Sequence, residues 1–202
     1  MDTSLVEQRR GEILEAALRI FSEKGYHAAK IEDIATELNL GHGTFYRYFK
    51  NKLDIFNHVV EAIVRMITEL VTDINPYDAQ TLDDYRGQLE TIGDRLFGLF
   101  ESNPYISRVI FYEAFGIDDE DLRKRIQEVF DLIGGYIEMY LKNGIEKGYM
   151  REDLHVTESA FAIGGALFEA CKRVVASPDP DRDLAVWKET IITLIIQGVA
   201  RR

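Results

Sequence analysis

The residues best suited to chemistry lie in segment 40–52, which reads LGHGTFYRYFKNK. Four aromatic side chains fall within five residues, and Arg47, Lys50 and Lys52 stand between and after them. Tyrosine hydroxyls on rigid rings, together with guanidinium and ammonium groups, are donors that suit the oxygens of a phosphate. Gly43 has no side chain, so another backbone can approach it closely. The segment therefore predicts a phosphate-binding surface.

Helical spacing divides the four rings into two pairs. Phe45 and Phe49 lie four residues apart and so share one face of a helix, which we expect to pack into a core. Tyr46 and Tyr48 then point outward with their hydroxyls, next to Arg47. A short aromatic helix is more often core than binding surface. This division assigns the two phenylalanines to the core and the two tyrosines to the surface.

Other chemistry is poorly supported by the sequence. Gly41-x-Gly43 lacks a third glycine and follows no strand, no phosphate-binding P-loop is present, and Cys171 lies on an apolar helical stripe. The histidines have no metal-ligand spacing, at positions 27, 42, 58 and 155. We therefore expect no enzyme, no cofactor and no metal.

Length and composition are those of a globular protein. The 202 residues are 46% hydrophobic and 29% charged, and the longest apolar run, AFAIGGALF, is half of what a membrane span needs. The N-terminus has no signal-peptide core, and a single cysteine fits a reducing compartment. We expect a cytoplasmic protein that has no membrane partner.

The net charge of −11 is unevenly distributed. Residues 1–52 carry eight Lys/Arg and eight Asp/Glu, so the rest of the chain carries the whole negative charge. An acidic protein binds nucleic acid poorly in general, but a neutral segment with its positive charge on one surface can bind DNA. The asymmetry indicates two parts with different partners.

Helical periodicity runs through nearly the whole chain, which predicts an all-α protein. Gly25 ends the first helix, residues 39–41 form a tight turn, and Asn51 caps the helix that leads to about residue 73. The expected helices cover about 4–24, 31–38, 42–49, 52–73, 80–101, 104–115, 119–147, 155–176 and 181–200. They make a three-helix head, a connecting helix and a larger helical body.

Two short helices around a tight turn form a helix-turn-helix unit. Its second helix enters the major groove of DNA, and the N-terminal residues of that helix meet the base edges. Here those residues are His42, Gly43 and Thr44. A threonine bonds a base or touches a thymine methyl, and a histidine donates or accepts a hydrogen bond.

The N-terminal region, above all GTFYRYFKNK, resembles the DNA-binding head of the TetR (tetracycline-repressor-like) family of bacterial regulators. The resemblance covers about residues 7–67 and leaves 68–202 as a helical ligand-binding and dimerisation domain. It implies a homodimeric transcription factor, usually a repressor, that is nucleoid-associated when bound to DNA. This sequence departs from the family pattern at Lys30 and Gly41, where the family usually has polar capping residues. The DNA-binding residues expected are Lys30, His42, Gly43, Thr44, Tyr46, Arg47, Tyr48, Lys50 and Lys52.

Each of the last two expected helices carries a stripe of small and apolar residues along one face. Gly164 and Gly165 together cost roughly 2 kcal/mol relative to alanine inside a helix, and close helix approach is the usual compensation. By resemblance, these helices form a four-helix bundle with a second subunit; packing within the chain is the alternative. The interface residues expected are Gly164, Gly165, Phe168, Trp187, Ile191, Leu194 and Ile195.

The middle helices are expected to hold a pocket for a small effector. Many rings and no clear polar cluster favour an apolar or amphipathic ligand, such as an acyl chain or aromatic compound. The candidate residues are Phe97, Phe100, Arg108, Phe111, Glu113, Phe115, Phe130, Tyr136, Met139, Tyr140 and Phe161.

We expect such an effector to release the dimer from a palindromic double-stranded operator. Two alternatives stay open. One is an activator; the other is a helical sensor or adaptor that does not read DNA by itself.

Overall fold

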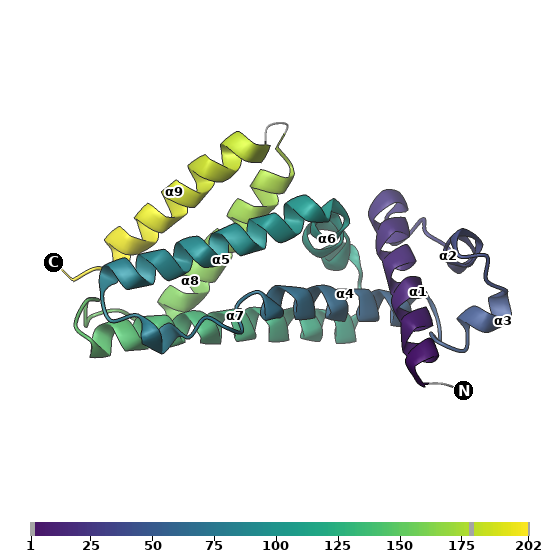
Figure 1. Cartoon of the computed structure of the whole chain (residues 1–202), viewed down its shortest axis with the longest axis horizontal. Coiled ribbons are helices and arrows are strands. Elements are labelled where there is room, and N and C mark those ends of the chain that lie inside the picture. Colours follow the sequence, from purple (N-terminus) through teal and green to yellow (C-terminus); the bar gives the residue numbers. More distant parts are fainter. Residues whose placement is uncertain (1–2, 178–179, 202) are drawn as a thin grey trace. The chain divides into compact units, whose positions relative to one another are not determined.

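The computed structural model describes residues 3–177 and 180–201, and its regular elements in these ranges are helices (Figure 1). Met150 and Ala200 form an isolated antiparallel bridge. The all-α prediction is therefore confirmed. The α-helices are α1 Thr3–Lys24, α2 Ile31–Glu37, α3 His42–Phe45, α4 Lys52–Glu69, α5 Leu82–Ser102, α6 Pro104–Arg108, α7 Glu120–Glu146, α8 Val156–Val175 and α9 Pro180–Val199.

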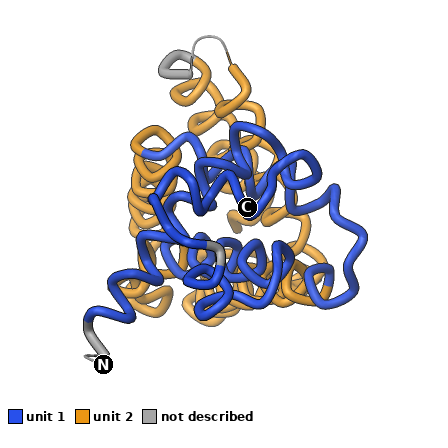
Figure 2. The backbone as a smooth tube through the Cα atoms, turned by 90° about the vertical axis from the view of Figure 1, so that its right-hand side faces the viewer, with its two compact units in different colours: residues 1–66, 103–123 blue, residues 67–102, 124–202 orange. Residues whose placement is uncertain are grey.

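The chain forms two compact units (Figure 2). The first holds residues 1–66 and 103–123, and the second holds residues 67–102 and 124–202. The first unit thus takes in a segment that follows α5 in the chain. The domain ranges expected from the sequence, 7–67 and 68–202, stay a prediction.

The core of the first unit is built from apolar faces of α1, α2 and α4. Gly25 ends α1 with a φ of 78°, a conformation that glycine adopts without strain. Next to it, the ring of Phe56 packs edge-on against Phe21 at 5.1 Å and against Tyr26 at 4.9 Å between centroids. These contacts fix the end of α1 and the start of the next loop against α4.

The prediction of one helix over residues 104–115 is wrong in part. The short α6 is followed by a π-helix, Val109–Glu113, and by a 3-10 turn, Ala114–Gly116. Glu113 Oε2 accepts a hydrogen bond of 2.7 Å from the backbone N–H of Tyr26. Tyr26 and Glu113 are far apart in the sequence. The helical periodicity of residues 104–115 therefore does not indicate the change from α-helix to π-helix.

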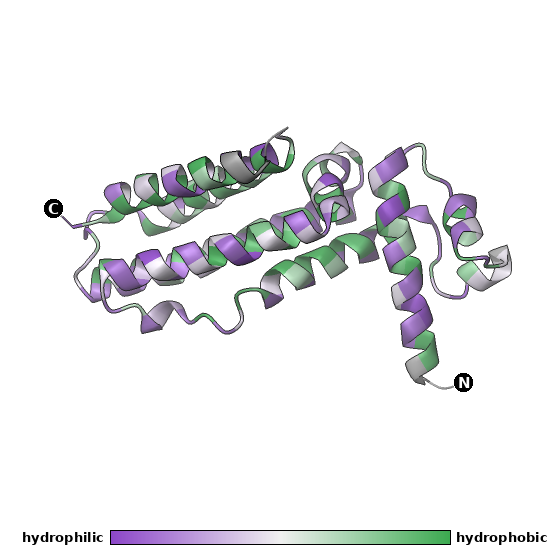
Figure 3. Cartoon of the chain, turned by 45° about the horizontal axis from the view of Figure 1, so that its top comes forward, coloured by the Kyte–Doolittle hydropathy of each residue, from purple (hydrophilic) through white to green (hydrophobic). Residues whose placement is uncertain are grey.

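The second unit is a bundle in which α5, α8 and α9 pack against one another. Its core includes Tyr85 and Tyr140, whose ring centroids lie 5.3 Å apart, and the apolar face of α9 around Ile191 and Ile195. Figure 3 shows hydrophobic and hydrophilic residues along each long helix, as expected for helices with one buried face. Among the described helices, none has the length and apolar character to cross a membrane.

Candidate functional site

Helix α2 begins directly after Lys30, whose side chain is exposed. Asp33 Oδ2 accepts a hydrogen bond of 2.9 Å from the backbone N–H of Lys30, and its Oδ1 pairs with Lys24 Nζ at 2.8 Å. The Lys24 ammonium is the main reason that the pKa of Asp33 is lowered. The acidic residue therefore stabilises the start of α2.

The turn between α2 and α3 is tight. Asn39 has a φ of 51°, the left-handed conformation that asparagine tolerates better than most residues. The backbone N–H of Leu40 then donates to the carbonyl of Ala35 at 2.8 Å, which closes the end of α2. The expected turn over residues 39–41 is confirmed, and α3 starts at His42.

Helix α3 is shorter than the sequence predicts. It ends at Phe45, and hydrogen-bonded turns continue the chain, with the Tyr48 N–H donating to the Phe45 carbonyl at 2.9 Å. The start of α4 is then capped: Asn51 Oδ1 accepts from the Asp54 N–H, and Asp54 Oδ2 accepts from the Lys50 N–H, each at 2.8 Å. The predicted continuation to residue 49 is therefore wrong, while the predicted cap at Asn51 is confirmed.

The four rings of segment 45–49 are divided as the spacing predicts. Phe45 is 0% exposed and Phe49 is 1% exposed, and their centroids lie 5.9 Å apart. Tyr46 is 52% exposed, and Tyr48 is half-buried. The two phenylalanines thus anchor the segment while Tyr46 faces solvent.

The remaining residues of the expected surface lie around these rings. Gly43, Arg47 and Lys50 are exposed, and Thr44 is half-buried. A Cβ placed on Gly43 meets nothing within 4 Å, so its face is open. The side chain of His42 lies outside the described residues. The DNA contacts of the whole set stay predictions.

Lys52 is held inside the first unit. Its Nζ donates to the carbonyls of Tyr26 at 2.8 Å, Ala29 at 3.0 Å and His27 at 3.1 Å. The ammonium also lies 4.6 Å from the centre of the Tyr26 ring. All three of its N–H donors are engaged by the loop between α1 and α2. This position fixes the loop against the start of α4, a function that the sequence did not indicate.

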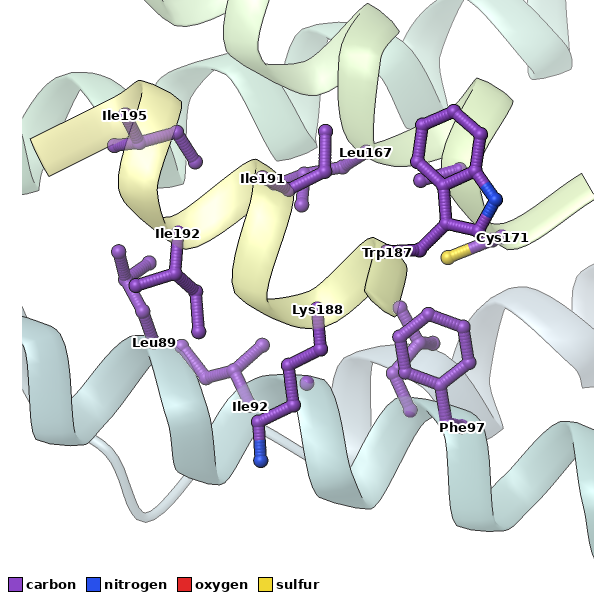
Figure 4. A pocket seen from close by; sticks show the side chains of 13 residues that line it. Leu89, Ile92, Phe97, Leu167, Cys171, Trp187, Lys188, Ile191, Ile192 and Ile195 are labelled. Carbon is purple, nitrogen blue, oxygen red and sulfur yellow. The ribbon is translucent and has the colours of Figure 1, made fainter. Parts of the chain in front are cut away.

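The second unit contains a cavity of about 70 Å³ between α5, α8 and α9 (Figure 4). Its wall is formed by residues such as Ile92 and Phe97 of α5, Leu167 of α8, and Trp187 and Ile191 of α9. The lining is apolar apart from Lys188 of α9. Sequence reasoning missed most of this lining, because isolated Leu and Ile residues on helices carry no signal that separates a cavity wall from a core.

Of the expected pocket residues, Phe97 lines this cavity. The others are spread over both units. Glu113 accepts from the Tyr26 backbone, Tyr136 donates from its hydroxyl to the Ile74 carbonyl at 2.8 Å, and the rings of Phe130 and Phe168 lie 5.4 Å apart. The first unit holds Arg108, Phe111, Glu113 and Phe115, and the second holds Phe100, Phe130, Tyr136, Met139, Tyr140 and Phe161.

The expected interface residues fall on different faces of α8 and α9. Gly164, Ile191 and Ile195 are buried within the chain, and Trp187 lines the cavity. Gly165 is exposed with open space at its Cβ position, and Leu194 is 62% exposed. Phe168 packs on Phe130. Within one protomer, the exposed part of this set is therefore available to a second chain.

The only cysteine of the sequence, Cys171, is a poor nucleophile. Its side chain is buried on α8 beside the cavity, and burial raises the pKa of the thiol to about 12. The thiolate is the reactive form of cysteine, so this residue is unreactive at neutral pH. In the described parts of the chain, no group of three or more His, Cys, Asp or Glu residues is placed to hold a metal.

Comparison with known proteins agrees with this geometry. Residues 13–59 match the family model for bacterial regulatory proteins of the tetR family. The fatty acid metabolism regulator protein of Bacillus subtilis (strain 168) is 25% identical over 188 residues, which is 93% of this chain and 94% of that protein. The nucleoid occlusion factor SlmA of Actinobacillus pleuropneumoniae is 24% identical over 173 residues, 85% of this chain and 81% of that protein.

A solved structure extends the similarity to nearly the whole fold. The crystal structure of the transcriptional regulator FadR from Bacillus subtilis, in complex with stearoyl-CoA, superimposes with a TM-score of 0.77. The two chains are 26% identical, and the match covers 93% of this chain and 97% of FadR. With its buried phenylalanine pair, its capped turn and its exposed basic segment, the N-terminal part of the chain is a DNA-binding domain of the tetR type, and the chain is similar to transcriptional regulators over nearly its whole length.

Proposed function

We propose that this protein is a homodimeric repressor that binds a palindromic operator and is released by a fatty-acyl ligand. The observation that carries the DNA-reading part is the division of segment 43–50. Phe45 and Phe49 are buried, so the segment is fixed, while Tyr46, Arg47 and Lys50 stay in solvent.

Each exposed residue of the segment has a proposed contact. Tyr46, Arg47 and Lys50 bind phosphate oxygens, and Tyr48 contributes its hydroxyl next to them. Gly43 and Thr44, with His42, approach the base edges. Lys30 binds the DNA backbone at the start of α2. Because Lys52 already donates to three carbonyls, we assign it to holding segment 43–50, the reader, in place rather than to binding phosphate.

The dimer is proposed to form through the exposed faces of α8 and α9. Leu194 and Phe161 are 62% and 42% exposed, and Gly165 permits close approach of a second backbone. A two-fold axis would set two readers on half-sites roughly 34–36 Å apart or a multiple of that. Such a protein acts in the bacterial cytoplasm and associates with the nucleoid when it binds its operator.

The proposed effector is an acyl thioester of coenzyme A. It is supported by the FadR structure, which contains stearoyl-CoA, and by the apolar cavity of the second unit. An acyl chain matches an apolar wall, and binding that favours one state of the dimer would shift its affinity for DNA.

Selection from a random DNA pool tests the DNA-reading function. Wild-type protein should recover a palindrome, and Tyr46→Ala should recover none while remaining folded and dimeric. Loss of one hydrogen bond to a charged phosphate at each half-site costs roughly tenfold or more in affinity. A folded, dimeric wild type that enriches no site would instead support the sensor or adaptor.

The dimer is tested separately by a charge on the exposed face of α9. Leu194→Glu should shift the protein toward monomer in sedimentation experiments, because a carboxylate would be desolvated in the interface. Leu132→Glu is the matched control, since Leu132 is 54% exposed on α7. Equal behaviour of the two variants would move the interface away from Leu194.

A further inference from the structure

The cavity of the second unit has one charged residue in its lining. Residues of three helices form the wall, and all are apolar except Lys188. Figure 4 shows the Lys188 side chain running from α9 toward α5, with its nitrogen at the far end. The aliphatic stem thus forms part of the wall, while the ammonium lies at the edge of the cavity.

The present partner of this ammonium is an exposed carboxylate. Lys188 Nζ lies 2.5 Å from Asp94 Oδ1 on α5, and the two side chains are 26% and 65% exposed. Ion pairs with an exposed partner contribute little to stability, because water solvates the separated charges well. Another anion at the same place can therefore replace Asp94 at small cost.

We propose that this cavity binds the acyl chain of an anionic amphiphile, with Lys188 as the residue that holds its headgroup. The inference rests on the proposed function, which it deepens by assigning the effector site. Apolar lining accounts for the chain, and the exchangeable ion pair accounts for the anionic head. The headgroup chemistry fits both a free carboxylate and the phosphates of a coenzyme A thioester.

The volume adds a structural consequence. A cavity of about 70 Å³ holds only a few carbon atoms, since an apolar cavity of roughly 150 Å³ is needed for benzene. A longer chain must widen the space between α5 and α9. The Lys188–Asp94 pair joins these two helices, so binding and the breaking of this pair are coupled.

The chain carries its own reporter for the test. Trp187 is the single tryptophan of the sequence and lines the cavity. Its fluorescence is measured while free wild-type protein is titrated with decanoyl-CoA, decanoate or decanol. Lys188→Met removes the charge but keeps the stem. Asp94→Asn frees Lys188, and Gly93→Leu fills the cavity at a position where a Cβ meets no atom within 4 Å.

We expect decanoyl-CoA and decanoate to change the Trp187 signal. Lys188→Met should weaken them by about tenfold and leave decanol unchanged, because only the anions lose a charged partner. Asp94→Asn should tighten the anions by roughly twofold to fivefold. Gly93→Leu should abolish binding of all three. Response to decanoyl-CoA alone would identify the thioester as the source, and response to both anions would identify any fatty-acyl anion.

Two results would overturn the inference. Equal weakening of decanol and decanoate by Lys188→Met would show that Lys188 acts only through packing. An unchanged Trp187 signal in wild type, while decanoyl-CoA still releases DNA, would place the effector elsewhere and leave the proposed function standing. If no acyl ligand changes either Trp187 or DNA binding, both the effector and this site are wrong, although the DNA-reading function is not.

Discussion

The reader segment of the first unit and the cavity of the second unit present their ligand-binding groups in opposite ways. In the reader, polar side chains such as Tyr46 and Lys50 stand in solvent on a frame of buried rings. In the body, the candidate site is an apolar wall, and its one charge, on Lys188, already has a partner. Recognition of a phosphate polymer needs exposed donors, whereas recognition of an acyl chain needs buried surface.

The contrast between the exposed reader and the apolar cavity shows which kind of site can be predicted from a sequence. Exposed polar and basic residues interrupting a helical apolar pattern stand out from a core. Leu89, Ile92 or Ile191 in a cavity wall do not stand out, because every buried helix face has such residues. Variants that change either a buried supporting residue or an exposed residue in the same region therefore test the comparison.

The largest effect is expected from the frame of the reader. Phe45→Ala should lower the free energy of unfolding of the first unit by about 3–5 kcal/mol, because it leaves a cavity where a fully buried ring stood. Tyr46→Ala, the neighbouring exposed ring, should change it by less than about 0.5 kcal/mol. Urea unfolding followed by circular dichroism measures both. Similar losses in the two variants would mean that Tyr46 also belongs to the frame.

A smaller effect on stability is expected to distinguish Lys52 from Lys50, two lysines that were both expected from the sequence to bind DNA. Lys52→Met should lower the free energy of unfolding by about 2 kcal/mol, because hydrogen bonds to charged groups contribute roughly 1.5–3 kcal/mol and three carbonyls lose their donor. Thermal unfolding measures the loss.

Lys50→Met is the matched control, since its side chain is exposed. It should leave stability unchanged and lower the slope of log affinity against log salt by about one. Lys52→Met should leave that slope unchanged. A lower slope for Lys52→Met at wild-type stability would return Lys52 to the phosphate contacts.

The smallest effect concerns two neighbouring glycines in α7. Gly135→Ala should raise the free energy of unfolding by about 0.5–1 kcal/mol, because the new Cβ meets no atom within 4 Å and alanine favours helix. Gly134→Ala should bring no gain, because its Cβ would lie 3.0 Å from the Phe161 ring. Chemical unfolding measures both, and an equal gain would show that Phe161 moves freely aside.

Much of the fold followed from the sequence. Helical periodicity predicted the helices of the body, Gly25 and Asn39 marked helix ends, and the spacing of Phe45 and Phe49 predicted their burial. Two predictions failed. Helix α3 ends at Phe45 rather than Phe49, and the segment after α6 contains a π-helix, Val109–Glu113, in which Glu113 binds the distant backbone of Tyr26.

The candidate sites were predictable to different degrees. The exposed residues of the reader were named from spacing and from the family resemblance. The inward position of Lys52 was not predicted, because its three acceptors are backbone carbonyls about 25 residues away. Trp187 and Ile191 were expected to contact a second subunit. Within the chain they line a cavity, because the face of α9 that carries them packs on α5 and α8, and their contact with a second subunit stays a prediction.

One titration joins the two regions. Operator DNA carrying a dye is bound to the protein, decanoyl-CoA is added, and DNA anisotropy is recorded together with Trp187 fluorescence. Both signals should change over the same ligand range in wild type, whereas Gly93→Leu should bind the operator normally and show neither change. Release of DNA with a silent Trp187, or a Trp187 response with the DNA fully bound, would contradict the account.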